Sequence, residues 1–115
     1  MAKIAKVTVT VEIDGAPVRG FPLSRRLSLD ETASFSSDFT TGSFVDLPIS
    51  FITTKQLVYA APASTSTFQF GNGAAGNIQI NSGGFLLLVD CSVATDIEAQ
   101  PAAGTVVIDG IVGGT

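Results

Sequence analysis

The chain has 115 residues, of which 45% are hydrophobic and 14% are charged, and its formal net charge is −4. A chain of this length predicts one domain over residues 1–115. The single cysteine excludes an intrachain disulfide and any multi-cysteine metal site, and the lack of histidine excludes the usual catalytic triads. No apolar run approaches the ~20 residues that span a bilayer, so we expect neither a membrane partner nor a signal peptide.

Charge is distributed unevenly along the chain. Residues 1–26 hold five basic residues against two acidic ones, a net charge of +3, whereas the remainder holds one basic residue against eight acidic ones, a net charge of −7. We predict that the N-terminal segment is a docking arm or hairpin that contacts an acidic partner through Lys3, Lys6, Arg25 and Arg26. The alternative is that these charges are solvated at sheet edges. A net charge of +3 is too small to predict nucleic-acid binding.

Residues 7–13 alternate between apolar and polar, which predicts a strand, and Asp14-Gly15 is typical of a tight hairpin turn. Residues 21–29 place Phe21, Leu23, Leu27 and Leu29 on one face, with Pro22 indicating an edge strand or a broken one. Residues 30–43 are polar. We predict a connection there, anchored by Phe35 and Phe39, whose i, i+4 spacing also allows a short helical turn.

The second half of the chain predicts further short strands. Residues 45–51 alternate, with Pro48 facing outward, and shorter strands are expected over 57–60, 68–70 and 78–80. Residues 85–89 are apolar at both parities, which predicts a central strand covered on both faces. A weaker strand around Val93 and Ile97 and a final one over 105–108 complete the set. Eight or nine strands without an amphipathic helix predict an all-β antiparallel sandwich of jelly-roll or related Greek-key type.

Gly71, Gly73 and Gly76 have the G-x-G-x-x-G spacing of dinucleotide-binding proteins. That motif needs a helix directly after the glycines, because the helix N-terminus binds the pyrophosphate. Residues 77–81 instead alternate with period two, as a strand does. We therefore predict that the glycines turn the chain between two strands and bind no nucleotide.

Other chemistry finds little support in the sequence. We expect no enzymatic activity, no cofactor and no metal, although Asp30-Glu31, Asp90, Asp96 and Glu98 leave a calcium site at loop ends as an alternative. Cys91 follows an apolar run, which predicts a buried, inert thiol. Lys55 is predicted to be an exposed turn residue. The lack of tryptophan and the single tyrosine weaken a carbohydrate-binding interpretation.

The stretches "MAKIAKVTVTVEIDGAPV", "KQLVYAAPASTSTFQF", "GNIQINSGGFLLLVDC" and "GTVVIDGIV" together resemble small structural proteins of tailed bacteriophage particles. The resemblance lies in strand and turn patterns, which here comprise Thr8, Thr10, Ile13, Asp14, Gly15, Ile78, Ile80, Gly83 and Gly84. It implies a non-enzymatic virion component and assigns no functional residue.

Within this class we expect a capsid decoration (cement) protein on the surface of the virion, made in the host cytoplasm, with the major capsid protein as its partner. A head-completion or tail component is an alternative, and a carbohydrate- or receptor-binding module of a fibre or adhesin is an alternative from another class. We also expect a homo-oligomer, most simply a trimer. A monomer would barely cover Phe35, Phe39 and Phe44 if they lay in a polar connection.

Overall fold

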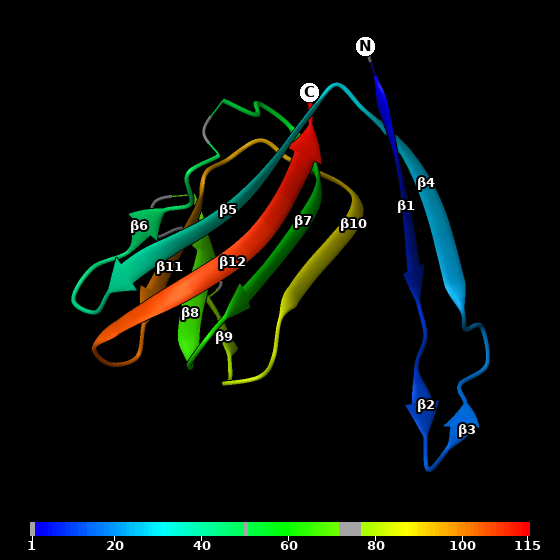
Figure 1. Cartoon of the computed structure of the whole chain (residues 1–115), viewed down its shortest axis with the longest axis horizontal. Coiled ribbons are helices and arrows are strands. Elements are labelled where there is room, and N and C mark those ends of the chain that lie inside the picture. Colours follow the sequence, from blue (N-terminus) through cyan, green and yellow to red (C-terminus); the bar gives the residue numbers. More distant parts are fainter. Residues whose placement is uncertain (1, 50, 72–76) are drawn as a thin grey trace.

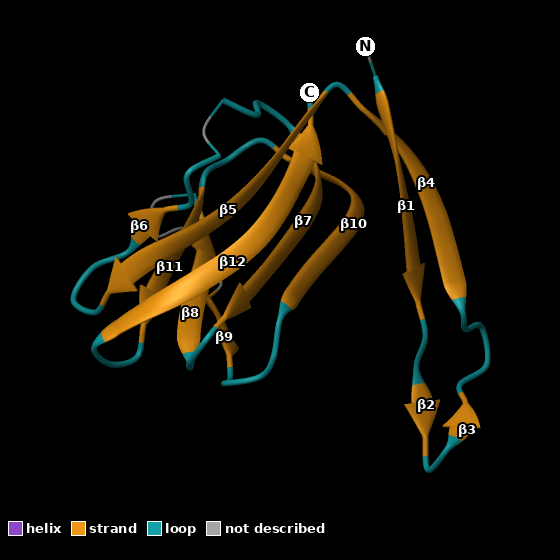
Figure 2. Ribbon diagram, in the orientation of Figure 1, coloured by secondary structure: helices purple, strands orange, loops and turns teal. Residues whose placement is uncertain are grey.

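The computed structural model describes residues 2–49, 51–71 and 77–115, and all of the regular structure within them is β-strand (Figure 2). Four strands form an N-terminal two-stranded ribbon: β1 (Lys3–Val9), β2 (Glu12–Ile13), β3 (Ala16–Pro17) and β4 (Leu23–Leu29). Eight strands form a sandwich: β5 (Glu31–Thr40), β6 (Val45–Asp46), β7 (Lys55–Pro62), β8 (Ser66–Phe70), β9 (Asn77–Ile80), β10 (Leu86–Val93), β11 (Ile97–Pro101) and β12 (Thr105–Gly114).

The sandwich is a jelly roll. Its first strand pairs with its last (β5 with β12), the second with the second last (β6 with β11), the third with the third last (β7 with β10), and the middle two with each other (β8 with β9), all antiparallel. Two further pairings, β12 with β7 and β11 with β8, complete sheets of order β10-β7-β12-β5 and β6-β11-β8-β9. This is the arrangement of a long hairpin rolled into two sheets, and it confirms the predicted fold class.

The core lies between the two sheets and consists of alternate residues from each strand. Phe39, Phe68, Ile97, Ile108 and Val112 are among its buried side chains. Gly110 leaves space for a neighbouring ring, because a Cβ built there would lie 2.5 Å from the Phe35 ring. Every second side chain of each strand therefore faces the interior, as the sequence pattern predicted.

The structure corrects the predicted connection over residues 30–43. Residues 31–40 form β5, the whole length of which pairs with β12, and the helical-turn alternative is wrong. Phe39 is buried in the core and Phe35 packs against it, because Ala33, Phe35 and Phe39 share the inward parity of the strand. These rings are covered by the chain's own core, so they give no reason to expect an oligomer.

Three other predicted strands differ in the structure. The weak strand expected around Val93 and Ile97 does not form as one element, because Val93 ends β10 and Ile97 begins β11. Among the described residues of 45–51, which leave out residue 50, Val45 and Asp46 alone form a strand. The chain then turns through hydrogen bonds from Ile49 N to Leu47 O and from Ile52 N to Ile49 O. Of the predicted strand over residues 85–89, residues 86–89 lie in β10, which is an edge strand rather than a central one. It is apolar at both parities because one face contacts the core and the other contacts the ribbon.

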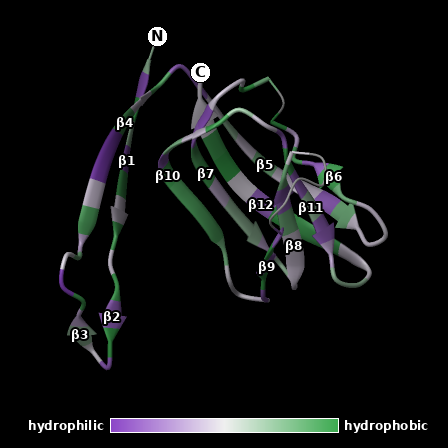
Figure 3. Ribbon diagram, turned by 180° about the vertical axis from the view of Figure 1, so that it is seen from behind, coloured by the Kyte–Doolittle hydropathy of each residue, from purple (hydrophilic) through white to green (hydrophobic). Residues whose placement is uncertain are grey.

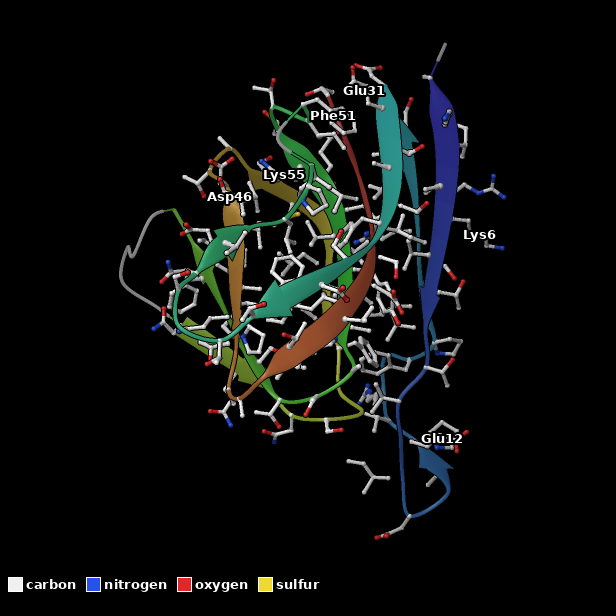
Figure 4. All side chains as sticks on the ribbon, turned by 60° about the vertical axis from the view of Figure 1, so that its left-hand side comes forward. Lys6, Glu12, Glu31, Asp46, Phe51 and Lys55 are labelled. Carbon is white, nitrogen blue, oxygen red and sulfur yellow. The ribbon has the colours of Figure 1, made fainter. Side chains whose placement is uncertain are left out.

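The ribbon lies outside the sandwich, and its β2–β3 end extends beyond it in Figures 1 and 4. The radius of gyration is 14.8 Å, against about 13 Å for a compact domain of 100 residues. The molecule is therefore more extended than a jelly roll alone.

Candidate functional site

The ribbon is one continuous hairpin. β1 pairs with β4 from Lys3↔Leu29 to Val9↔Leu23, and β2 pairs with β3 at the distal end. Asp14 and Gly15 form the turn with φ values of 53° and 78°, the left-handed pair that a two-residue type I′ hairpin requires. The predicted Asp14-Gly15 turn is thus confirmed. Residues 21–29 form the returning strand only from Leu23 onward, after a cis Phe21–Pro22 bond.

The inner face of the ribbon packs on the outer face of the β10-β7-β12-β5 sheet near one end. Leu27 and Leu29 are buried there against Leu57, with Val89 packed beside them. Gly113 makes this contact possible, because a Cβ at that position would lie 2.5 Å from Leu29 Cδ1. The ribbon is therefore fixed at its base, where β4 leads through Asp30 into β5, and Asp30 N donates to Gly114 O.

The register divides the four predicted docking residues between two faces of the ribbon. Lys6 is directly opposite Arg26, and both lie on the outer face, which faces away from the sandwich (Figure 4). Arg25 is opposite Val7 on the inner face, beyond the buried contact. Lys3 lies at the base, where its Nζ donates to Thr32 Oγ1 at 3.2 Å. Lys6 and Arg26 are brought together, and Lys3 and Arg25 lie apart from them.

Two like charges placed directly opposite each other on a ribbon are destabilising. Lys6 and Arg26 form such a pair, both are exposed, and no ion pair involving them occurs in the part of the chain that the structure describes. An acidic surface brought against this face would reduce the repulsion. The geometry is therefore suited to binding an acidic partner.

Exposed apolar side chains form a second feature that the sequence analysis missed. Leu23 on the ribbon is 51% exposed and Ile111 on the outer face of the sheet is 48% exposed. Ile111, Tyr59 and Leu87 form one row across β12, β7 and β10, and the ring of Phe85 lies 5.8 Å from that of Tyr59. Figure 3 shows the hydrophobic colouring of β10 and the hydrophilic stretch of β4. Val107 and Ile111, at the outward parity of β12, were the apolar residues in the sequence that belong to this face.

Three acidic residues of the sandwich, Asp46, Asp96 and Glu98, lie near one another. Asp46 is the register partner of Glu98, which accepts a hydrogen bond of 2.8 Å from Gln69 Nε2. Desolvation, followed by repulsion from Asp96 and Glu98, raises the pKa of Asp46, and the nearby Lys55 acts in the opposite direction. Figure 4 shows Asp46 and Lys55 at the same end of the sandwich.

Lys55 corrects a prediction. Its side chain is 2% exposed rather than solvated, and its Nζ donates to Thr95 O at 3.0 Å. Of the acids considered for calcium, Asp96 and Glu98 lie near Asp46, while Asp30 and Glu31 lie at the β4–β5 junction. No three His, Cys, Asp or Glu side chains among the described residues are grouped so that they could hold a metal ion.

Cys91 is only partly buried, and its Sγ donates to Lys55 O at 3.4 Å. Burial is the main cause that raises its pKa, which favours the protonated, unreactive thiol. Residues 77–80 form β9, which pairs antiparallel with β8, so a strand rather than a helix follows the glycines, as predicted. Gly71 has a φ of 70°, whereas Gly73 and Gly76 lie outside the described residues.

The described residues enclose no pocket and include no helix that could cross a membrane. Comparison with family models, curated proteins and solved structures found no match to the chain. The candidate site is therefore a surface, consisting of the basic outer face of the ribbon and the exposed apolar positions beside it.

Proposed function

We propose that this chain is a non-enzymatic structural protein of a bacteriophage virion, a capsid decoration (cement) protein that binds the outer shell of the head and stabilises it. The observation that carries this proposal is the ribbon, which projects from an acidic jelly roll and presents Lys6 and Arg26 side by side on its outer face. A ribbon anchored at its base and free at its end can reach a neighbouring protein while the jelly roll remains folded.

The charge arrangement supports attachment to an acidic surface of the major capsid protein. Exposed ion pairs contribute about 0–1 kcal/mol each, so the basic face orients the chain and apolar contacts supply most of the affinity. Jelly rolls also occur in viral capsid domains, an analogy at the level of the fold. The proposed assembly is a homo-oligomer, most simply a trimer, on the capsid surface.

The test is the composition of purified particles from a culture that produces the chain. We expect the chain at a fixed ratio to the major capsid protein by quantitative mass spectrometry. A double variant, Lys6→Glu with Arg26→Glu, should reduce the bound copies. Ala102→Glu with Ala103→Glu, two exposed changes on the jelly roll that also add negative charge, serves as the control and should bind as the parent does. Absence of the chain from particles contradicts the proposal.

The Tyr59–Phe85 pair favours a second candidate function, a carbohydrate- or receptor-binding module. Aromatic rings on an exposed sheet face provide a flat apolar surface for a sugar ring, and Phe85 is 57% exposed. Calorimetry with a panel of cell-surface oligosaccharides distinguishes the two functions. Binding that is lost in Phe85→Ala would support this candidate, and the absence of heat would exclude it for the sugars tested.

A further inference from the structure

We propose that the exposed part of the outer face of the β10-β7-β12-β5 sheet binds the distal half of the ribbon of a second copy of this chain. Ile111 and Asp109 on β12 form the binding surface, here called the seat. Leu23 and Arg25 on the neighbour's β4 contact it. The inference deepens the proposed assembly role, on which it rests for the expectation that copies associate.

The ribbon and the sheet already form this kind of contact within one chain. Leu27 and Leu29 of β4 are buried on the outer face of the sheet at Gly113, Leu57 and Val89. The same apolar face continues on both elements beyond that contact, as Leu23 on the ribbon and as Ile111 and Val107 on the sheet, with Leu23 and Ile111 about half exposed. A second ribbon can therefore extend an existing interface.

The two surfaces match in spacing and in charge. Leu23 and Arg25 are two residues apart on one strand face, and so are Ile111 and Asp109. Two residues along a strand span roughly 6.6 Å, so placing Leu23 over Ile111 can bring Arg25 to Asp109. Asp38, the register partner of Val107, adds a second carboxylate on this face. Arg25 of the ribbon thus meets a carboxylate beside an apolar contact.

The whole molecule also exposes enough additional surface to form one side of a standard interface. The chain exposes 6671 Å², whereas a compact monomer of 11.8 kDa exposes about 5,900 Å². The excess of roughly 800 Å² equals what one partner of a standard interface buries. Because the ribbon and the seat are different surfaces, the contact is heterologous and either closes into a ring, such as a trimer, or continues as a filament.

Sedimentation velocity on the isolated full-length chain over a range of concentrations tests this contact. We expect the parent to associate, and Leu23→Asp or Ile111→Asp to weaken association at least about tenfold, because each puts a carboxylate in an apolar contact. Ile4→Asp on the outer face of the ribbon and Ile78→Asp on β9 are matched controls, since both side chains are exposed, and should associate as the parent does. Circular dichroism establishes that each variant is folded.

Charge exchange gives the decisive comparison. Arg25→Asp and Asp109→Arg should each weaken association, and the two together should restore it to within about threefold of the parent, because the pair is re-formed in reverse. A chain that stays monomeric at every concentration contradicts the contact. So does an oligomer in which Leu23→Asp and Ile111→Asp behave like the controls. If the chain associates through this contact but is absent from particles, the decoration function is contradicted and the contact is not.

Discussion

Gly113 is the single residue on which the attachment of the ribbon depends most directly. A Cβ there would overlap Leu29 Cδ1, so Gly113→Ala should lower the free energy of unfolding by about 1–3 kcal/mol. Thermal and denaturant unfolding measure the change. The matched test is the same substitution in a Leu29→Ala background, where the overlapping atom is gone and the additional loss should be smaller. Equal losses in both backgrounds would show that Leu29 is not the cause.

Asp46 gives the chain a small dependence of stability on pH. Its pKa is raised above the usual 3.8 in the folded state, so ionising it there is unfavourable and destabilises the fold at neutral pH. Below pH 3.8 the group is protonated in both states and the penalty disappears. Asp46→Asn should therefore be more stable than the parent at pH 7, by less than about 1 kcal/mol because the group is exposed, and the difference should vanish as the pH falls.

The free energy of unfolding of Asp46→Asn and of the parent, measured between pH 3 and pH 7, tests this pH dependence. Asp38→Asn, on the outer face of the other sheet, makes the same change of net charge and is the control. A stabilisation by Asp46→Asn that persists at low pH would contradict the electrostatic cause.

The sequence could not predict the burial of Lys55. Lysine is rarely buried without a partner, and a polar neighbourhood around Thr53 and Thr54 indicated a turn. The partner is a backbone carbonyl, Thr95 O, forty residues further along the chain. Such a contact becomes visible only once β7 and the segment before β11 are placed side by side.

The ribbon and the jelly roll should differ in local stability. An isolated two-stranded hairpin is marginally stable in water, so the ribbon depends on the buried contact at its base. Leu27→Ala removes part of this contact and should lower the free energy of unfolding by about 2–5 kcal/mol, the range for such truncations of buried side chains. Hydrogen exchange should become faster in β1 and β4 and remain as in the parent in β7 and β12. Uniform acceleration through every strand would contradict a separable ribbon.

Element type and fold class were predictable, and several element boundaries were not. The pattern of apolar residues correctly indicated residues 7–9, 57–60, 68–70 and 105–108 as strands, and the number of short strands indicated a sandwich of jelly-roll or related Greek-key type. β5 was missed because its serines, threonines and acids suggested a connection, although Ala33, Phe35 and Phe39 share one parity. Over residues 45–51 the error was the reverse, because a strand was predicted where most of the segment is a turn. The alternation there reflects the burial of Leu47 and Ile49 in that turn.

At the scale of the molecule, the charge division follows the architecture. The basic residues of the N-terminal segment lie on the ribbon and the acidic ones are spread mainly over the jelly roll. If the ribbon steers attachment, raising the salt concentration from 0.05 to about 0.5 M should slow binding to particles more than it speeds release, because screening acts on the approach of exposed charges. Surface plasmon resonance on immobilised particles separates the two rates. A salt effect confined to release would argue against steering.

The candidate site was predictable only in part. The uneven charge of the sequence pointed to Lys3, Lys6, Arg25 and Arg26 as a group, but their division between two ribbon faces depends on the register of β1 against β4. The exposed apolar surface at Ile111 was not predicted, because an outward apolar residue of a strand is indistinguishable in sequence from one that is covered by another element. The ribbon covers only the part of the sheet near Gly113, so Ile111 remains exposed.

The central claim is that the ribbon attaches this chain to a virion shell. Cross-linking mass spectrometry on purified particles tests it most directly, with an amine-to-carboxyl reagent that joins lysines to acidic residues. We expect the chain in the particles, with cross-links from Lys6 to carboxylates of the major capsid protein. Particles that lack the chain, or that contain it with Lys6 linked to no shell protein while carboxylates of the jelly roll are linked to shell lysines, would contradict the claim.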